Sequence, residues 1–390
     1  MGVNPHFAAA IGRNLRHWQA ELTTGRDAET QRLLPQQSEM VLAAQFGVAL
    51  PATQADVIAL IERSVNLIER TRSEQLWLPI LERLHAAPEI QADECAYHTV
   101  IHRLAHFLRL SERLDEAIAL LEAHRPSSPS PLLTGKMNLQ LSSCYQHRGR
   151  LEDALNAAQT AHEQFVAVGD EKWQASAAND IGLILTELER FEEAATWFEA
   201  AKRFELAHGD DTRIVRVWTN IGRLYELQNE PVAAMRAYFE AQEYLDGSES
   251  IEDVIRVLVN LGHVYLTLKR HDDARRMLER AQEKLRLAPH LILLRANTLV
   301  NLGTAQYWLA AYDDALVKMA QAFEIFEQLG RLRSAAHARM NIGDIQRARG
   351  ERTASADAYR AAIALVEEEA TPAARRLREQ ASEKLSQLPD

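Results

Sequence analysis

The feature that most constrains this chain is a small residue that returns about every forty positions. Each of these residues lies in a stretch whose apolar side chains follow a 3.6-residue period, which is typical of an amphipathic helix. Their spacings are 37, 40, 40, 40, 41 and 40 residues. The seven positions, which we call the anchor column, are Ala105, Ser142, Gly182, Gly222, Gly262, Gly303 and Gly343.

Three further columns keep the same register. The residue before each anchor is always Leu or Ile. The residue twelve positions after it is alanine except at Ser355, and the residue nineteen after it is alanine except at His124. Agreement over seven copies is the signature of a repeat architecture, in which each unit packs on its neighbours.

Close packing explains the small residues. Two antiparallel helices approach to about 8–10 Å only where the side chains between them are small. A glycine inside a helix costs about 1 kcal/mol relative to alanine, so five glycines in register indicate that a larger side chain would push the helices apart. Ala, Leu, Glu and Arg dominate the composition and favour helix. We therefore predict an all-α fold of antiparallel helix pairs.

These columns resemble the tetratricopeptide repeat, in which small residues occupy three matching places of a helix-turn-helix. Trp218, Tyr225, Tyr238 and Tyr359 match places where that family often carries aromatic residues. The period of about forty is similar to the long-helix subgroup found in kinesin light chain and in the sensor arrays of bacterial signalling ATPases and peptide-sensing regulators. The resemblance implies a right-handed α-solenoid whose concave groove is lined by the first helix of each pair.

The repeat also divides the chain. We expect a helical N-terminal extension over 1–54, a degenerate helix pair over 55–92, seven repeat pairs over 93–370 and a capping helix over 371–390. Thr371 and Pro372 suit the N-cap and first position of that last helix. A terminal helix of this kind covers apolar surface that an open final repeat would expose to water.

Asparagines two positions before the anchor form a ladder. Asn220, Asn260, Asn301 and Asn341 hold this place, and Asp180 holds it in an earlier unit with Asn179 beside it. An amide both donates and accepts hydrogen bonds, so a ladder of amides suits a peptide backbone. In relatives that bind extended peptides, asparagines at the matching place do this. The alternative is that each asparagine bonds to the neighbouring repeat.

Four basic residues share the predicted groove face. Arg216 and Arg256 stand six positions before their anchors, and Arg223 and His263 stand one after. Arginine binds carboxylates in a bidentate way, so this patch favours a partner with an acidic segment. The alternative is that these residues form ion pairs within the protein, which add little stability at exposed positions.

A further stripe raises the question of metal binding. Cys95, His98, His102 and His106 lie three or four residues apart on one predicted helix. Ligands along one straight helix cannot all converge on a tetrahedral ion, so we expect no metal and place these histidines in the groove or the core. No nucleotide-binding, hydrolase or metalloprotease motif occurs, so we expect no catalysis and no cofactor.

Composition limits the remaining classes of function. The net charge of −11 argues against a nucleic-acid partner. The two cysteines are too few for a disulfide framework, and no apolar stretch is long enough for a signal peptide or a membrane span. We expect a cytoplasmic, non-enzymatic scaffold that binds a protein or peptide, with a regulatory or adaptor role. The alternative is a module that only self-associates. The sequence leaves the partner, the oligomeric state and the role of residues 1–50 open.

Overall fold

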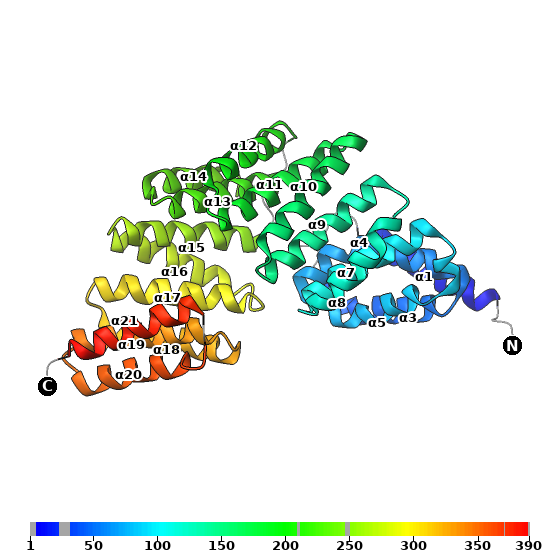
Figure 1. Ribbon diagram of the computed structural model, residues 1–390. Coiled ribbons are helices and arrows are strands. Elements are labelled where there is room, and N and C mark those ends of the chain that lie inside the picture. Colours follow the sequence, from blue (N-terminus) through cyan, green and yellow to red (C-terminus); the bar gives the residue numbers. More distant parts are fainter. Residues whose placement is uncertain (1–4, 23–31, 209–210, 246–249, 370, 389–390) are drawn as a thin grey trace. The chain divides into compact units, whose positions relative to one another are not determined.

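The computed structural model describes residues 5–22, 32–208, 211–245, 250–369 and 371–388. Within these ranges every regular element is a helix (Figure 1). The chain divides into two compact units, Met1–Asn220 and Ile221–Asp390, with the boundary inside helix α13. None of the described helices is both long and apolar enough to span a bilayer.

Antiparallel helix pairs make up most of the described chain. The first helices of the pairs are α7 (Glu94–Leu110), α9 (Pro131–His147), α11 (Glu171–Glu187), α13 (Asp211–Leu227), α15 (Ile251–Thr267), α17 (Ile292–Trp308) and α19 (Leu332–Ala348). The second helices are α8 (Leu114–His124), α10 (Leu151–Val168), α12 (Phe191–His208), α14 (Pro231–Glu243), α16 (His271–Leu285), α18 (Tyr312–Gln328) and α20 (Arg352–Leu365). The predicted all-α fold of antiparallel helix pairs is confirmed.

The anchor column packs against the second helix of each pair. A Cβ atom on Gly182 would lie 2.6 Å from a ring carbon of Phe198, and one on Gly343 would lie 2.6 Å from a ring carbon of Tyr359. Both rings are fully buried. The glycines therefore create the space that the partner helix fills with a large side chain, which is the packing reason predicted for their recurrence.

Two serines explain irregularities in the columns. Ser142 holds an anchor place, and its hydroxyl donates to the carbonyl oxygen of Ala154 on the facing helix at 2.7 Å. Ser355 replaces the usual alanine of the second helix, and its hydroxyl donates to the carbonyl oxygen of Gly343 at 2.8 Å. In both pairs a small side chain keeps the helices close while its hydroxyl gains a buried partner.

A left-handed residue ends every first helix of the seven pairs. Seven positions after each anchor, φ lies between 57° and 80°. Glycine occupies only two of these places, Gly149 and Gly350, and the others hold larger residues: Glu112, Glu189, Asn229, Lys269 and Ala310. This conformation closes the last turn of a helix and reverses the chain. Non-glycine residues adopt it at a steric cost.

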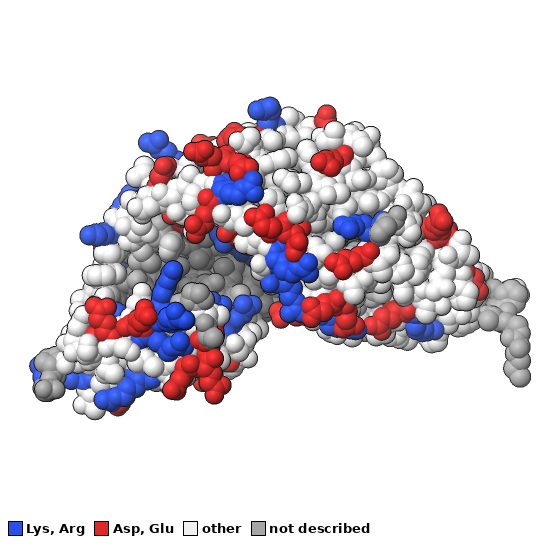
Figure 2. Space-filling model, viewed as in Figure 1, with Lys and Arg blue, Asp and Glu red and all other residues white. Residues whose placement is uncertain are grey.

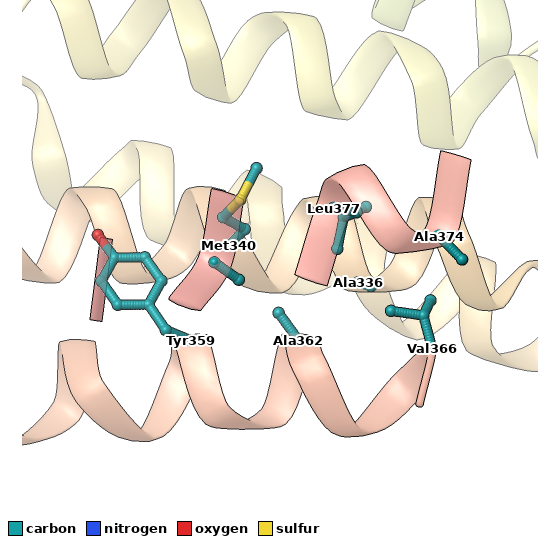
Figure 3. Close-up of a cluster of buried hydrophobic side chains, with 8 residues drawn as sticks. Ala336, Met340, Tyr359, Ala362, Val366, Ala374 and Leu377 are labelled. Carbon is teal, nitrogen blue, oxygen red and sulfur yellow. The ribbon is translucent and has the colours of Figure 1, made fainter. Parts of the chain in front are cut away.

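Helices also lie toward both ends of the described part of the chain. At the N-terminus, α1 (Pro5–Glu21) packs against α3 (Gln37–Val48) and α4 (Gln54–Thr71), followed by α5 (Glu74–His85) and the short α6 (Pro88–Gln91). At the C-terminus, α21 (Pro372–Ser386) buries Ala374, Leu377 and Ala381 in a cluster with Tyr359 and Val366 (Figure 3). Thr371 accepts the backbone N–H of Ala374 at 3.2 Å, so the predicted N-cap is confirmed. The division of the chain at residues 54, 92 and 370 into regions with separate roles stays a prediction.

Candidate partner-binding site

The asparagines of the predicted ladder differ from one another in their hydrogen-bond partners. The Asn220 amide donates to the Asn179 side chain at 2.8 Å, which joins α13 to α11 within the first unit. Asn341 lies 3.4 Å from the ring of His337 on its own helix. Asn260 and Asn301 are half-buried, and their side chains form no hydrogen bond with another described residue. The neighbouring-repeat alternative thus applies to Asn220 and does not apply to Asn260 or Asn301.

The four basic residues of the predicted patch are exposed, and two have acidic neighbours. Arg256 donates to Glu252 of its own helix at 3.0 Å. His263 lies 3.2 Å from Glu226 of α13, whose carboxylate raises the pKa of that histidine. Arg216 also makes a polar interaction, and Arg223 is exposed. Acidic side chains of the protein itself therefore neutralise part of the positive charge that we predicted would bind an acidic peptide.

The Cys95–His106 stripe separates into different environments. Cys95 is exposed, whereas His98, His102 and His106 are buried. His98 contacts the Glu94 carbonyl oxygen at 2.8 Å and the Ser127 hydroxyl at 3.2 Å, and His106 contacts Glu69 at 2.7 Å. The described residues contain no group of three His, Cys, Asp or Glu side chains placed to hold a metal ion.

A continuous polar surface runs along the first helices of the first unit. Side chains bridge successive first helices at several points, and four of these bridges are Arg103 to Glu62, Arg109 to Gln140, Arg213 to Ser176 and Asn220 to Asn179. The corresponding distances are 2.8, 3.4, 3.0 and 2.8 Å. We call this surface, from α4 to the first half of α13, the unit 1 polar face.

Three charged side chains on this face are half-buried without an ion-pair partner among the described residues. They are Arg109 on α7, Lys136 on α9 and Asp180 on α11. The Lys136 ammonium lies 5.1 Å from the ring centroid of Trp173, which is a cation–π contact. Charges removed from water are costly unless they are paired, so holding these three groups half-buried costs free energy.

Burial also shifts the pKa values of these three charged groups. Burial raises the pKa of Asp180 to about 6, and the Asn179 amide and the charges of Arg109 and Arg213 only partly oppose this shift. Burial also lowers the pKa of Lys136 and of the Arg109 guanidinium. His102, buried near Lys136, has a pKa well below its usual value, first because of burial. Perturbed groups gathered on one surface are typical of a functional site.

Asn179, Asp180 and Asn220 of this face were predicted from the sequence as site residues, whereas Arg109, Lys136, Arg213 and Trp173 were not. A signal was present, because Lys136 stands six residues before its anchor, in the same column as Arg216 and Arg256. The earlier repeats simply lack the Asn-Ile-Gly phrase that drew attention to the later ones.

Figure 2 shows acidic and basic side chains interspersed on the face in view, without the basic stripe that a nucleic-acid partner requires.

Comparison with known families and proteins identifies the repeat. Residues 133–204 and 255–283 match family models described as tetratricopeptide repeat. Protein KINESIN LIGHT CHAIN-RELATED 1 of Arabidopsis thaliana is 24% identical over 205 residues, which is 50% of this chain. The chain spans about a third (33%) of the length of that relative.

Solved structures share the fold over almost the whole chain. The quorum sensor NprR of B. thuringiensis, in its apo form, is 13% identical, with a TM-score of 0.61 over 92% of this chain and 99% of that one. A Rap protein in complex with competence and sporulation factor is 12% identical, with a TM-score of 0.59 over 97% of this chain and 99% of that one. Two separate stretches of the chain thus match the tetratricopeptide repeat itself, and the helix pairs around them keep the same anchor packing.

Proposed function

We propose that the protein is a non-catalytic scaffold that binds a peptide, or an extended segment of a partner protein, on the unit 1 polar face. The observation that carries the proposal is the presence of Arg109, Lys136 and Asp180 there, each half-buried and without an ion-pair partner among the described residues. Keeping such groups desolvated lowers stability, so a binding role explains their presence better than a structural one does.

The chemistry of this face suits a peptide. It offers a carboxylate, a guanidinium and an ammonium group, together with the amides of Gln140 and Asn179. A peptide supplies backbone donors and acceptors for the amides and charges of both signs for the ionic groups. A nucleic acid supplies phosphates, which the Asp180 carboxylate would repel.

The relatives support a binding role of the same kind. Tetratricopeptide repeats are generally scaffolds for protein interaction, and one structural neighbour is in complex with competence and sporulation factor while another is called a quorum sensor. We therefore extend the proposal to a regulatory or adaptor role in which the bound segment controls an effector. Placement in the cytoplasm belongs to the same proposal.

The test is selection of binders from a random peptide library with the purified full-length chain, followed by calorimetric measurement of Kd. Arg109→Gln and Lys136→Gln should each weaken a selected peptide by about tenfold or more. The matched control is Arg256→Gln, because Arg256 is exposed and paired with Glu252, and it should change Kd by less than about twofold. Failure to select any peptide, or an equal loss in the control, would refute the proposal.

A further inference from the structure

Five exposed apolar side chains gather at one end of the helix pairs in the second unit. They lie in two segments: the turn between α16 and α17 with the first residues of α17, and the turn between α18 and α19 with the first residue of α19. Because α17 and α18 are antiparallel, the C-terminal end of α18 lies beside the N-terminal end of α17. One buried cluster joins these two helix ends to the N-terminal end of α19, and it contains Ala296, Leu299, Phe326 and Ala335. We call the five the turn ridge: Leu287 (69% exposed), Ile292 (43%), Leu293 (41%), Leu329 (42%) and Leu332 (46%).

The ridge lies in two locally basic segments of an acidic protein. The segments 284–295 and 328–339 each contain three Lys or Arg residues and no Asp or Glu, although the net charge of the chain is −11. Arg333 pairs with Glu369 at 3.1 Å, and Arg339 lies over the Phe323 ring at 4.2 Å. Lys284, Arg286 and Arg331 have no ion-pair partner among the described residues.

The two helices that start at the ridge lack the usual N-terminal stabilisation. The N-cap residues of α17 and α19 are Leu291 and Arg331, neither of which forms a capping hydrogen bond, and neither helix has an acidic residue in its first turn. Three other first helices differ, because Asp93 caps α7, Asp170 caps α11 and Ser250 caps α15, whereas α9 also lacks both a capping hydrogen bond and an acidic first turn. The N-termini of α17 and α19 at the ridge therefore have no capping side chain. The positive ends of these two helix dipoles add to the positive charge of the nearby basic side chains.

We propose that the turn ridge docks an acidic segment of a partner protein that also carries aliphatic side chains. The aliphatic groups pack on the exposed Leu and Ile side chains, and the carboxylates meet Lys284, Arg286, Arg331 and the two uncapped helix ends. This surface lies on other helices than the unit 1 polar face, so the proposal can fail or hold independently of the proposed function.

Two other occupants fit the charges less well. An anionic lipid surface is broad, and it would also meet the acidic turn Glu367–Glu369, which reaches the ridge through the Arg333–Glu369 pair. The net charge of −11 opposes approach to such a surface as a whole. A second copy docking ridge to ridge would bring like charges together. A narrow acidic segment meets only the basic strip.

The experiment uses two labelled synthetic peptides with the same glutamate spacing, one with leucine and one with serine between the glutamates. We expect fluorescence anisotropy with the full chain to show binding of the leucine peptide that weakens with added salt, and at least tenfold weaker binding of the serine peptide. Arg286→Glu combined with Arg331→Glu, and separately Leu287→Ser combined with Leu332→Ser, should each weaken binding at least tenfold. All four side chains are exposed, so these variants should keep the wild-type helical signal.

Matched controls lie in the same unit. Arg236→Glu on α14 and Val317→Ser on α18 change exposed residues away from the ridge and should leave binding within twofold of the wild type. Equal loss in these controls, or equal binding of the serine peptide, would overturn the proposal. So would ridge-dependent sedimentation with anionic phospholipid vesicles in the absence of peptide binding, or a solution dimer that the ridge variants dissociate.

Discussion

Gly222 and Gly303 hold the same place in the repeat but face very different neighbours. A Cβ atom on Gly222 would lie 2.4 Å from a ring carbon of Tyr238, which is fully buried. A Cβ atom on Gly303 would lie 3.1 Å from the methyl carbon of Met319 and 3.2 Å from the Ala315 carbonyl oxygen. The same substitution, glycine to alanine, therefore tests how the anchor column works.

Two opposing effects set the magnitude. Alanine in place of glycine inside a helix gains about 1 kcal/mol. Overpacking a rigid core site costs about 1–3 kcal/mol, and sometimes more. The Tyr238 ring cannot move away, so Gly222→Ala should lose about 1–2 kcal/mol of unfolding free energy. The flexible Met319 side chain can adjust, so Gly303→Ala should be neutral or stabilising by up to about 1 kcal/mol.

The assay is urea unfolding followed by far-UV circular dichroism, combined with hydrogen exchange measured by mass spectrometry. Repeat arrays can unfold in segments, so a global midpoint alone does not locate the change. Faster exchange should appear in α13 and α14 for Gly222→Ala and should be absent from α17 and α18 for Gly303→Ala. Equal destabilisation by the two substitutions would show that contact with the facing side chain does not explain the anchor column.

Three further predictions follow from single residues. Ala310 has φ of 60°, so Ala310→Gly should raise unfolding free energy by about 1 kcal/mol in urea titration, and a loss would contradict the left-handed turn. The pKa of Asp180 is raised to about 6, so the folded state binds an extra proton between about pH 4 and 6 and loses stability as the pH rises through that window. Asp180→Asn should therefore raise the free energy of unfolding by about 1–2 kcal/mol at pH 7 and by almost nothing at pH 4. A variant that is less stable than the wild type at pH 7 would show that the carboxylate is well solvated. Ser142→Ala removes a buried hydrogen bond to Ala154 and should cost about 1 kcal/mol, whereas the neighbouring Ser143→Ala serves as a control that should leave the thermal midpoint unchanged.

Much of the fold could be predicted from local spacing. Each anchor contacts a side chain of the next helix, only sixteen residues away for Gly182 and Phe198 or for Gly343 and Tyr359. A contact between neighbouring segments leaves a repeated mark in the sequence, because each copy must solve the same packing problem. The left-handed residues at the ends of the first helices were not predicted, since Glu189 and Lys269 carry no glycine signal.

The candidate site was harder to predict because it depends on absent partners. Arg256 looked available for a ligand, although Glu252, four residues earlier, is close enough to pair with it. His263 meets Glu226, 37 residues away, across two first helices. Lys136 and Asp180 stand in the same columns as residues that were noticed, but nothing local shows that neighbouring helices leave them without counter-ions.

The sequence by itself determined the paired helices and their period, because backbone hydrogen bonding and contact between adjacent helices depend on residues close together in the chain. Only the tertiary structure decided which charges are neutralised and which are desolvated without a partner. Those outcomes depend on side chains from three or four helices at once, and on how much water the packed helices exclude.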